Sequence, residues 1–227
     1  MAKEKRTGRK RRAQTRREQI LLRINIVLAI AIVLVCFGIA VKENEIRNRI
    51  DPATIVVPEW IEQDFLVRNP YSRAGEPLTQ VKDIVVHYVA NPGTSHIQNR
   101  NYFNGLASQE GVDKTSASSH FIIGLDGTIL QCMPLSEVAY ANYPRNYDTI
   151  SIECCHPDET GAFTEETKAA LIRLTAWLCD ELRISEKHMI RHYDVSGKVC
   201  PKYYVDQEDK WTELRGQVRD EIRRSRK

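Results

Sequence analysis

The chain has 227 residues, which suggests one domain of about 150 residues with an extension rather than two full domains. Apolar residues make up 42%, charged residues 28% and aromatic residues 7%, a composition that excludes collagen-like, mucin-like and wholly disordered proteins. The net charge of +3 comes from a basic tail, because residues 1–23 carry ten Lys and Arg against two acids and the remaining 204 residues carry −5.

An apolar segment follows this tail. Residues 24–41 have the sequence INIVLAIAIVLVCFGIAV, in which Asn25 is the only strongly polar residue. A helix of that length is about 27 Å long, close to the ~30 Å hydrocarbon core of a bilayer. The pattern predicts a single transmembrane helix. The excess of Lys and Arg before it indicates a cytoplasmic N-terminus, with everything after the helix outside the cell membrane.

Three alternatives apply to these first two segments. A buried core helix is disfavoured, because charges flank both ends and no amphipathic face is visible. Cleavage as a signal peptide is less favoured, because the apolar run is longer than the usual 7–15 residue core, although Gly38 and Ala40 in residues 38–40 (GIA) are small residues of the kind that a signal peptidase needs. Nucleic-acid binding by residues 1–23 is a less economical explanation than a topology signal that contacts anionic lipids. We therefore expect a retained single-pass anchor and no nucleic-acid partner.

The region after the membrane segment falls into two parts. Residues 42–79 contain four prolines, which break any longer element, and are expected to form a stalk or linker. Residues 80–227 alternate strand and helix patterns and are the expected domain.

Strand patterns occur at four places in this domain. KDIVVHYV (82–89) contains three consecutive β-branched residues and predicts a buried strand. Residues 118–135 predict two strands joined at Asp126-Gly127, a strong hairpin signal. DTISIECC (148–155) has its two isoleucines on one face, and HMIRHYD (188–194) is expected to be the last strand.

Helix patterns lie between and after these strands. Residues 96–107 predict a short helix, and Thr164 is expected to cap a longer one that has acids in its first turn. Four leucines line one face of that longer helix at helical spacing, and residues 207–225 predict a polar terminal helix. The expected fold class is therefore α/β, a mixed central β-sheet with helices packed on it, preceded by one transmembrane helix.

Two histidines and a cysteine fit a metal site. His87 ends the first strand, and His192 is followed eight residues later by Cys200 in a loop that contains glycine. A catalytic zinc site takes three protein ligands of the N, S or O kind and keeps one position open for water. A partly buried histidine and a core cysteine are the alternative for such residues taken singly. The six cysteines are too irregularly spaced to indicate a disulfide framework.

Four motifs, in order, carry a family resemblance over residues 80–205. They are VVHY (85–88), SASSHFIIGLDGTILQCMP (116–134), NYDTISIE (146–153) and HYDVSGKVCP (192–201). The region resembles the zinc-dependent N-acetylmuramoyl-L-alanine amidase family, whose fold is shared by phage amidase-type lysozymes and peptidoglycan recognition proteins.

The resemblance implies a set of metal ligands and a catalytic pair. It makes His87, His192 and Cys200 the ligands of Zn2+, and it makes Glu153 and Lys198 catalytic. Glu153 ends an apolar strand, a costly place for a carboxylate unless it is paired or functional, and near a metal it can move a proton from water to a leaving amine. Lys198 lies two residues from a ligand and can stabilise an oxyanion. A strand-edge acid and a solvated loop lysine are the respective alternatives.

Substrate contacts are expected at three further positions, Tyr88, His120 and Asn146. His120 is equally consistent with a buried structural role. The chain departs from the family pattern at two positions. Ser119 stands where some phage members have a tyrosine implicated in catalysis, and Ala141 replaces a histidine that is common in the family.

The resemblance implies a function for the chain. It implies a bacterial, membrane-anchored hydrolase that cleaves the amide bond between N-acetylmuramic acid and L-alanine of the peptidoglycan stem peptide. The alternative is a non-catalytic peptidoglycan-binding receptor on the same fold. Retention of Glu153 and Lys198 beside a complete ligand set weighs against that alternative. A membrane scaffold that acts through its basic tail would leave the four ordered motifs unexplained.

Overall fold

The structure of the chain is a computed structural model that describes residues 18–21, 23–40 and 50–227. The chain divides into two compact units, with the boundary between residues 49 and 50. Each unit is described by itself.

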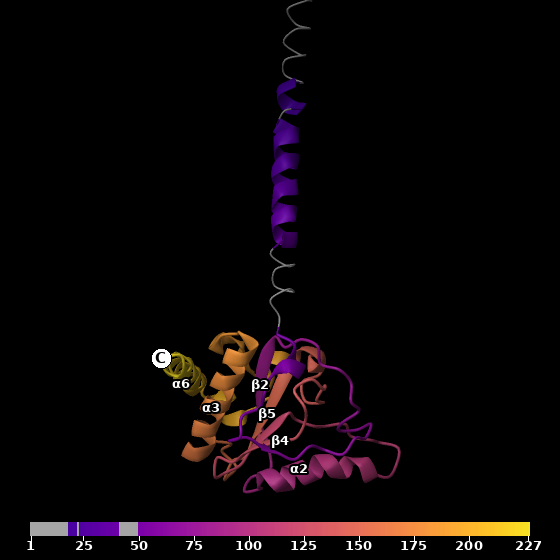
Figure 1. The fold of residues 1–227 in the computed structure, drawn as a ribbon, viewed down its shortest axis with the longest axis vertical. Helices are drawn as coiled ribbons and strands as arrows, with labels where there is room; N and C mark the ends of the chain where they lie inside the picture. The colour runs from indigo at the N-terminus through magenta and orange to yellow at the C-terminus, as the bar shows by residue number, and fades with distance from the viewer. Residues whose placement is uncertain (1–17, 22, 41–49) are drawn as a thin grey trace, which may run out of the picture. The chain divides into compact units, whose positions relative to one another are not determined.

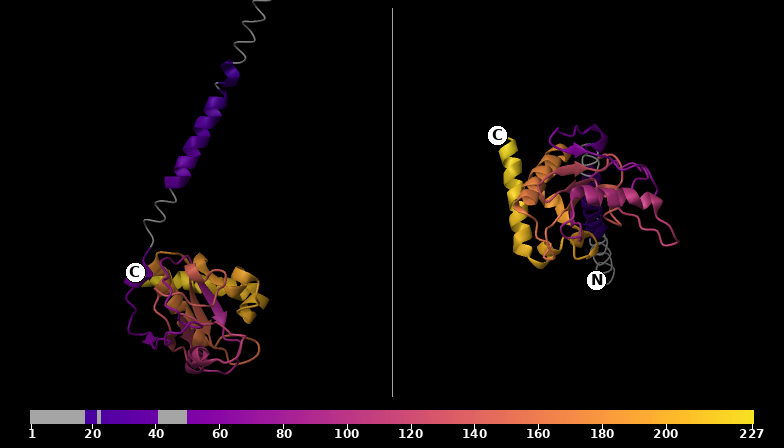
Figure 2. Two further views of the ribbon diagram at one scale, coloured as in Figure 1. Left: turned by 90° about the vertical axis from the view of Figure 1, so that its right-hand side faces the viewer. Right: turned by 90° about the horizontal axis from the view of Figure 1, so that it is seen from below.

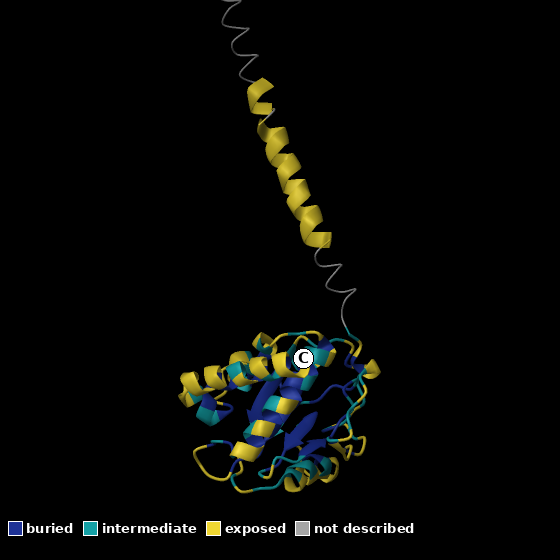
Figure 3. Cartoon of the chain, turned by 60° about the vertical axis from the view of Figure 1, so that its left-hand side comes forward, coloured by how far each residue is buried: buried dark blue, intermediate teal, exposed yellow. Residues whose placement is uncertain are grey.

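The described part of the first unit is one apolar helix, Glu18–Ala40. The side chains of its described residues are exposed (Figure 3). By length and composition it could cross a bilayer, and a signal sequence close to an N-terminus would have the same properties. Residues 1–17 and 22 of the predicted tail, residue 41 of the predicted anchor and residues 42–49 of the predicted stalk lie outside the described residues.

The second unit is built on a six-stranded mixed sheet with the strand order β1-β4-β3-β5-β2-β6. Strands β3 and β4 pair antiparallel, and the other neighbouring strands pair parallel. The strands are β1 (Glu62–Gln63), β2 (Asp83–Tyr88), β3 (Phe121–Ile123), β4 (Ile129–Gln131), β5 (Thr149–Cys154) and β6 (Met189–Arg191).

The predicted hairpin joins β3 to β4 at Asp126-Gly127. Gly127 has a φ of +82°, and a Cβ at this position would lie 2.9 Å from the carbonyl oxygen of Glu166. Glycine is therefore needed here both for the backbone conformation and for the close approach of the neighbouring helix.

Helices pack on this sheet, as the sequence predicted. The two longest, α3 and α6, lie side by side (Figures 1 and 2). The α-helices are α2 (His96–Gly105), α3 (Glu165–Leu182), α4 (His192–Ser196), α5 (Lys202–Asp206) and α6 (Glu208–Ser225), and the 3-10 turns are Pro52–Thr54, Leu106–Ser108, Asn146–Asp148 and Glu186–His188. Thr164 caps α3 by accepting a hydrogen bond from the N–H of Thr167, as its place before two acids predicted.

The alternation of side chains along β2 and β5 separates the core from the site. Ile84, Val86, Ile150 and Ile152 lie in the larger core cluster, together with the buried faces of α3 and α6. Successive residues of a strand point to opposite faces, so His87 lies on the other face of the sheet. A smaller cluster there includes Phe103 of α2 and residues of β3 and β4.

The structure differs from the expected stalk over residues 50–79. These residues belong to the folded unit, where Leu66 and Leu78 are fully buried and β1 extends the sheet beside β4. The Arg73 guanidinium forms an ion pair with Glu137 at 2.8 Å. Prolines prevent helices in this segment, but they allow an extended chain that packs against the sheet.

A second difference lies at the last strand. β6 ends at Arg191, and His192 is the first residue of the short helix α4. The Asp194 carboxylate accepts a hydrogen bond from the Arg191 backbone N–H at 2.8 Å and so turns the chain into that helix. All six cysteines, each within the described residues, are free.

Candidate active site

Three candidate residues meet at the carboxyl ends of three adjacent parallel strands. β2 lies between β5 and β6, and His87 of β2 is directly in register with Glu153 of β5. His192 follows the last residue of β6. Open α/β sheets bind ligands at this edge, because the loops that leave the strands surround it.

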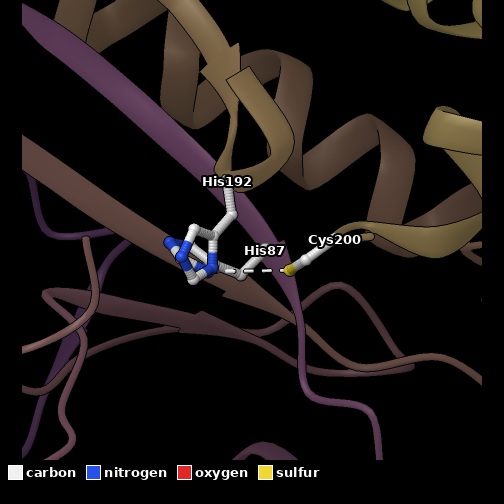
Figure 4. A group of neighbouring side chains, drawn as sticks. All are labelled: His87, His192 and Cys200. Atoms are coloured by element: carbon white, nitrogen blue, oxygen red, sulfur yellow. Dashed lines mark hydrogen bonds between the residues drawn. The ribbon is translucent and has the colours of Figure 1, made fainter. Parts of the chain in front are cut away.

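His87, His192 and Cys200 form a compact cluster (Figure 4). One ligand atom from each of the three lies within 4.8 Å of the other two. The Cys200 Sγ is 3.7 Å from the His87 Nδ1, and the two imidazole rings are 4.6 Å apart at an angle of 60°. His87 and Cys200 are buried, and His192 is half-buried.

The electrostatics of the cluster favour neutral imidazoles. Burial lowers the pKa of His87 to about 3, with the charges of His192 and Lys198 acting in the same direction. Burial and Lys198 also lower the pKa of His192. A neutral imidazole has a free ring nitrogen that can bind a metal. His192 Nδ1 is buried without a hydrogen-bond partner among the described residues, so it is available as such a ligand atom.

The ionisation of the Cys200 thiol depends on its burial and on the polar and charged groups around it. Burial and the negative charge of Glu153 raise the pKa of Cys200 to about 12, while the backbone N–H of Tyr88 and the charge of Lys198 lower it. A metal cation at the cluster would deprotonate this thiol, because a coordinated sulfur is held as the thiolate.

Glu153 places a carboxyl group next to the cluster. Its Oε1 is 3.8 Å from the His87 Nδ1, and its side chain is 15% exposed. The Oε2 atom is buried and has no hydrogen-bond partner among the described residues. Burial raises the pKa of Glu153 to about 8, and Lys198 lowers it. A carboxyl group with a pKa near neutrality can both accept and donate a proton at physiological pH.

Lys198 is exposed and lies in the loop between α4 and Cys200. Its positive charge acts on the pKa values of His87, Glu153 and Cys200. The structure thus brings together four of the five residues that the family resemblance assigned to the metal and to catalysis, and Lys198 lies in the loop that leads to Cys200.

The three residues that were expected to contact a substrate have identified neighbours within the protein. The Tyr88 ring lies on the core face of β2 and stacks on His156 at 5.0 Å. His120 is fully buried, with its Nε2 donating to the Glu137 carbonyl and its Nδ1 accepting from the Ser151 N–H. The Asn146 Oδ1 accepts a hydrogen bond from the Asn142 N–H at 2.6 Å. His120 therefore braces the fold, and Asn146 supports Asn142. Tyr88 follows His87 on β2, and its backbone N–H hydrogen-bonds Cys200. Contact of these three residues with a substrate stays a prediction.

Asn142 is a residue of the site that the sequence did not indicate. Its Oδ1 is 2.6 Å from the His87 Nε2, and the side chain is buried. The two residues are 55 positions apart, and no local pattern connects the segment around Asn142 to β2. The departure at Ala141 was visible in the sequence, but the role of its neighbour was not.

The fold and the site together define a class of protein. Two histidines, a thiol and a buried carboxyl group at the carboxyl edge of a mixed sheet have the donor set of metal-dependent hydrolases. The family described as N-acetylmuramoyl-L-alanine amidase matches residues 77–203 of the chain. The chain belongs to this family, and the expectation from its four motifs is confirmed.

Individual relatives agree with this assignment. The N-acetylmuramoyl-L-alanine amidase CwlL of Bacillus licheniformis is 31% identical over an alignment of 170 residues, which covers 70% of this chain and 46% of that protein. The N-acetylmuramoyl-L-alanine amidase BlyA of Bacillus subtilis (strain 168) is 28% identical and covers 68% of this chain and 46% of its own length. The chain therefore spans less than half the length of each of these curated relatives.

Solved structures show the same fold. The catalytic domain of XlyA is 26% identical with a TM-score of 0.57, and the match covers 70% of this chain and 98% of that domain. The structure of PlyL has a TM-score of 0.58 at 22% identity, with 70% of this chain and 96% of that chain covered, and supports the fold alone.

Proposed function

We propose that the chain is a zinc-dependent peptidoglycan hydrolase. Its reaction would be hydrolysis of the amide bond between N-acetylmuramic acid and L-alanine of the stem peptide. The observation that carries this proposal is the convergence of His87, His192 and Cys200 within 4.8 Å, with the buried Glu153 carboxyl group beside them. Membership of the amidase family supports the choice of bond.

The donor set fits zinc. Two imidazole nitrogens and one thiolate are ligands of the kind that Zn2+ prefers, and three protein ligands leave a position open for water or substrate. The buried, unpartnered Nδ1 of His192 is the observation that such an ion would explain. Zinc held there acts as a Lewis acid that activates water and polarises a carbonyl group.

The remaining steps fall to Glu153 and Lys198. Glu153 would accept a proton from the attacking water at its unpartnered oxygen and pass it to the leaving amine of L-alanine. Lys198 would bring its ammonium group to the oxyanion that develops on the attacked carbonyl. Proton balance is kept, because the proton that leaves the water is the one that the amine receives.

A product analysis tests the reaction. The full chain in detergent is incubated with purified peptidoglycan, and the soluble products are analysed by mass spectrometry. The proposal expects free stem peptides with new L-alanine amino termini and glycan strands that have lost their peptides. Binding of peptidoglycan without any release of peptides would instead support a receptor without catalysis.

A metal measurement tests the ligand set. The purified chain should hold about one zinc ion, and Cys200→Ser should lose most of it, because a neutral hydroxyl is a far poorer zinc ligand than a thiolate. Cys179→Ser, which changes a buried cysteine of the core, is the matched control and should keep its zinc. A full zinc content in Cys200→Ser would remove this residue from the proposed site.

We also propose a location. Residues 24–41 would span the cell membrane once, residues 1–23 would lie in the cytoplasm, and the second unit would lie outside, next to its peptidoglycan substrate. The apolar helix Glu18–Ala40 and the basic tail before it support this arrangement.

A further inference from the structure

Asn142 is held rigidly in the segment between β4 and β5. The side chain is 1% exposed. Its backbone N–H donates to Asn146 Oδ1, and its amide nitrogen donates to the Thr149 hydroxyl at 2.8 Å. Its amide oxygen faces the His87 Nε2 at 2.6 Å. Every polar atom of the Asn142 amide group therefore has one identified neighbour.

The Thr149 hydroxyl decides which way round this amide lies. It donates its single proton to the Arg145 carbonyl oxygen at 2.7 Å. Toward Asn142 it can therefore only accept a hydrogen bond, so the amide NH2 must face Thr149 and the amide oxygen must face His87. In the flipped orientation, two lone pairs would meet at Thr149.

The orientation of the amide in turn decides where the proton of His87 lies. An amide oxygen can only accept, so the His87 Nε2 must be the nitrogen that carries hydrogen. The other nitrogen, Nδ1, then has a free lone pair. It is Nδ1 that lies 3.7 Å from the Cys200 Sγ, at the proposed metal position.

We propose that Asn142 is a positioning residue that, together with Thr149, sets the tautomer and ring orientation of His87 so that Nδ1 is presented to the metal. A chain of hydrogen bonds, called the relay below, runs from the Arg145 carbonyl through the Thr149 hydroxyl and the Asn142 amide to the His87 imidazole. Residues that hydrogen-bond the outer nitrogen of a metal-binding histidine commonly contribute 10–100-fold to metal affinity. An amide does this without adding a negative charge near the metal. The inference rests on the proposed zinc site.

The tautomer can be measured directly. The full chain is labelled with 15N-histidine, stripped of metal with a chelator and studied by NMR in detergent micelles, with the His87 signals identified by their loss in His87→Gln. We expect His87 to be the Nε2–H tautomer in the wild-type protein and a mixture of tautomers in Asn142→Ala. Zinc affinity, measured by chelator competition, should fall about 10–100-fold in Asn142→Ala.

A pair of variants at Thr149 tests the relay without changing Asn142. Thr149→Val removes the hydroxyl that fixes the amide and should also give mixed His87 tautomers and weaker zinc binding, whereas Thr149→Ser should resemble the wild type. This pair carries the test if Asn142→Ala does not fold. An Nδ1–H tautomer in the wild type, or unchanged tautomer and affinity in Asn142→Ala or Thr149→Val, would overturn the proposal. Failure of the proposed function is distinguishable, because it would appear as absent amide cleavage with the tautomer results intact.

Discussion

The carboxyl group of Glu153 is held beside His87 by the parallel register of β5 and β2. At this position burial raises its pKa to about 8. The charged carboxylate is therefore costly to bury, and the charge of Lys198 offsets only part of that cost. The exposed Lys198 supplies the opposing charge that acts on Glu153. A carboxyl group kept in this way is typical of proton transfer in catalysis.

Glu153→Gln and Lys198→Ala should each lower turnover of peptidoglycan by roughly 10²–10⁴-fold, because each removes a group that acts on the transition state. Neither should change zinc content or substrate affinity much, which metal analysis and a binding assay would check. Glu159→Gln, an exposed acid on the loop after β5, is the matched control and should keep wild-type rates.

The double variant should lose less than the product of the two single losses, because both residues act on one intermediate. Glu153 should be the more damaging loss. Wild-type cleavage rates in both single variants would show that the catalytic pair has been placed incorrectly.

His120 should make the folded protein sensitive to acid. Burial lowers its pKa from 6.5 to about 4, although the hydrogen bond to the Glu137 carbonyl and the charge of Glu137 raise it. The unfolded chain therefore binds the proton more readily, so this stability is fully present above pH 6.5 and is lost as the pH falls toward 4. Over that range the loss amounts to about 3 kcal/mol.

Denaturant unfolding at pH 7 and pH 4.5 would measure this effect. His120→Gln stays neutral at both pH values, so its free energy of unfolding should fall less between them than that of the wild-type protein. Equal falls in the two proteins would assign the acid sensitivity to other groups, such as the carboxylates of surface ion pairs.

Elements with local signals were predicted well from the sequence. The Asp126-Gly127 turn needs only its own backbone conformation, and Thr164 caps α3 through an atom three residues away. The alternation of Ile150 and Ile152 indicated a buried face of β5 because strands repeat every two residues. The candidate metal ligands were identified because their motifs resemble a known family, and the convergence of these three side chains could not have been derived from spacing alone.

Elements that depend on distant partners were not predicted. The segment 50–79 has prolines and no strong periodicity, and its order comes from contacts with β4 and Glu137, more than 60 residues further along. The same limit applies to Asn142, whose partner His87 lies on a strand that precedes it by 55 residues. Local patterns carry no information about such pairs.

The packing of residues 50–79 predicts that the domain cannot begin at residue 80. A fragment of residues 80–227 would expose the surface that Leu66 and Leu78 cover and would leave β4 without β1. Burial of one leucine contributes about 1.5–3 kcal/mol, so the loss is a large part of a typical total stability of 5–15 kcal/mol. The fragment should unfold at a much lower temperature than residues 50–227 or should aggregate, as thermal unfolding and gel filtration would reveal. Equal unfolding temperatures would restore the stalk interpretation.

At the scale of the whole molecule, the apolar helix and the folded unit are separate bodies. We expect membrane fractions to retain the full-length protein, because the exposed apolar side chains of Glu18–Ala40 favour a bilayer over water. Protease added outside intact protoplasts should digest the second unit, and protease should reach residues 1–17 only after lysis. A soluble product that begins near residue 41 would show instead that the helix is a cleaved signal sequence.

The 113 residues that separate His87 from Cys200 have a consequence for how the protein matures. Synthesis proceeds from the N-terminus, so a ribosome adds Cys200 to the chain long after His87. A nascent or interrupted chain that ends before residue 200 lacks one of the three proposed zinc ligands, whatever part of the sheet it has already formed. Under the proposed function, such a chain cannot yet cleave peptidoglycan.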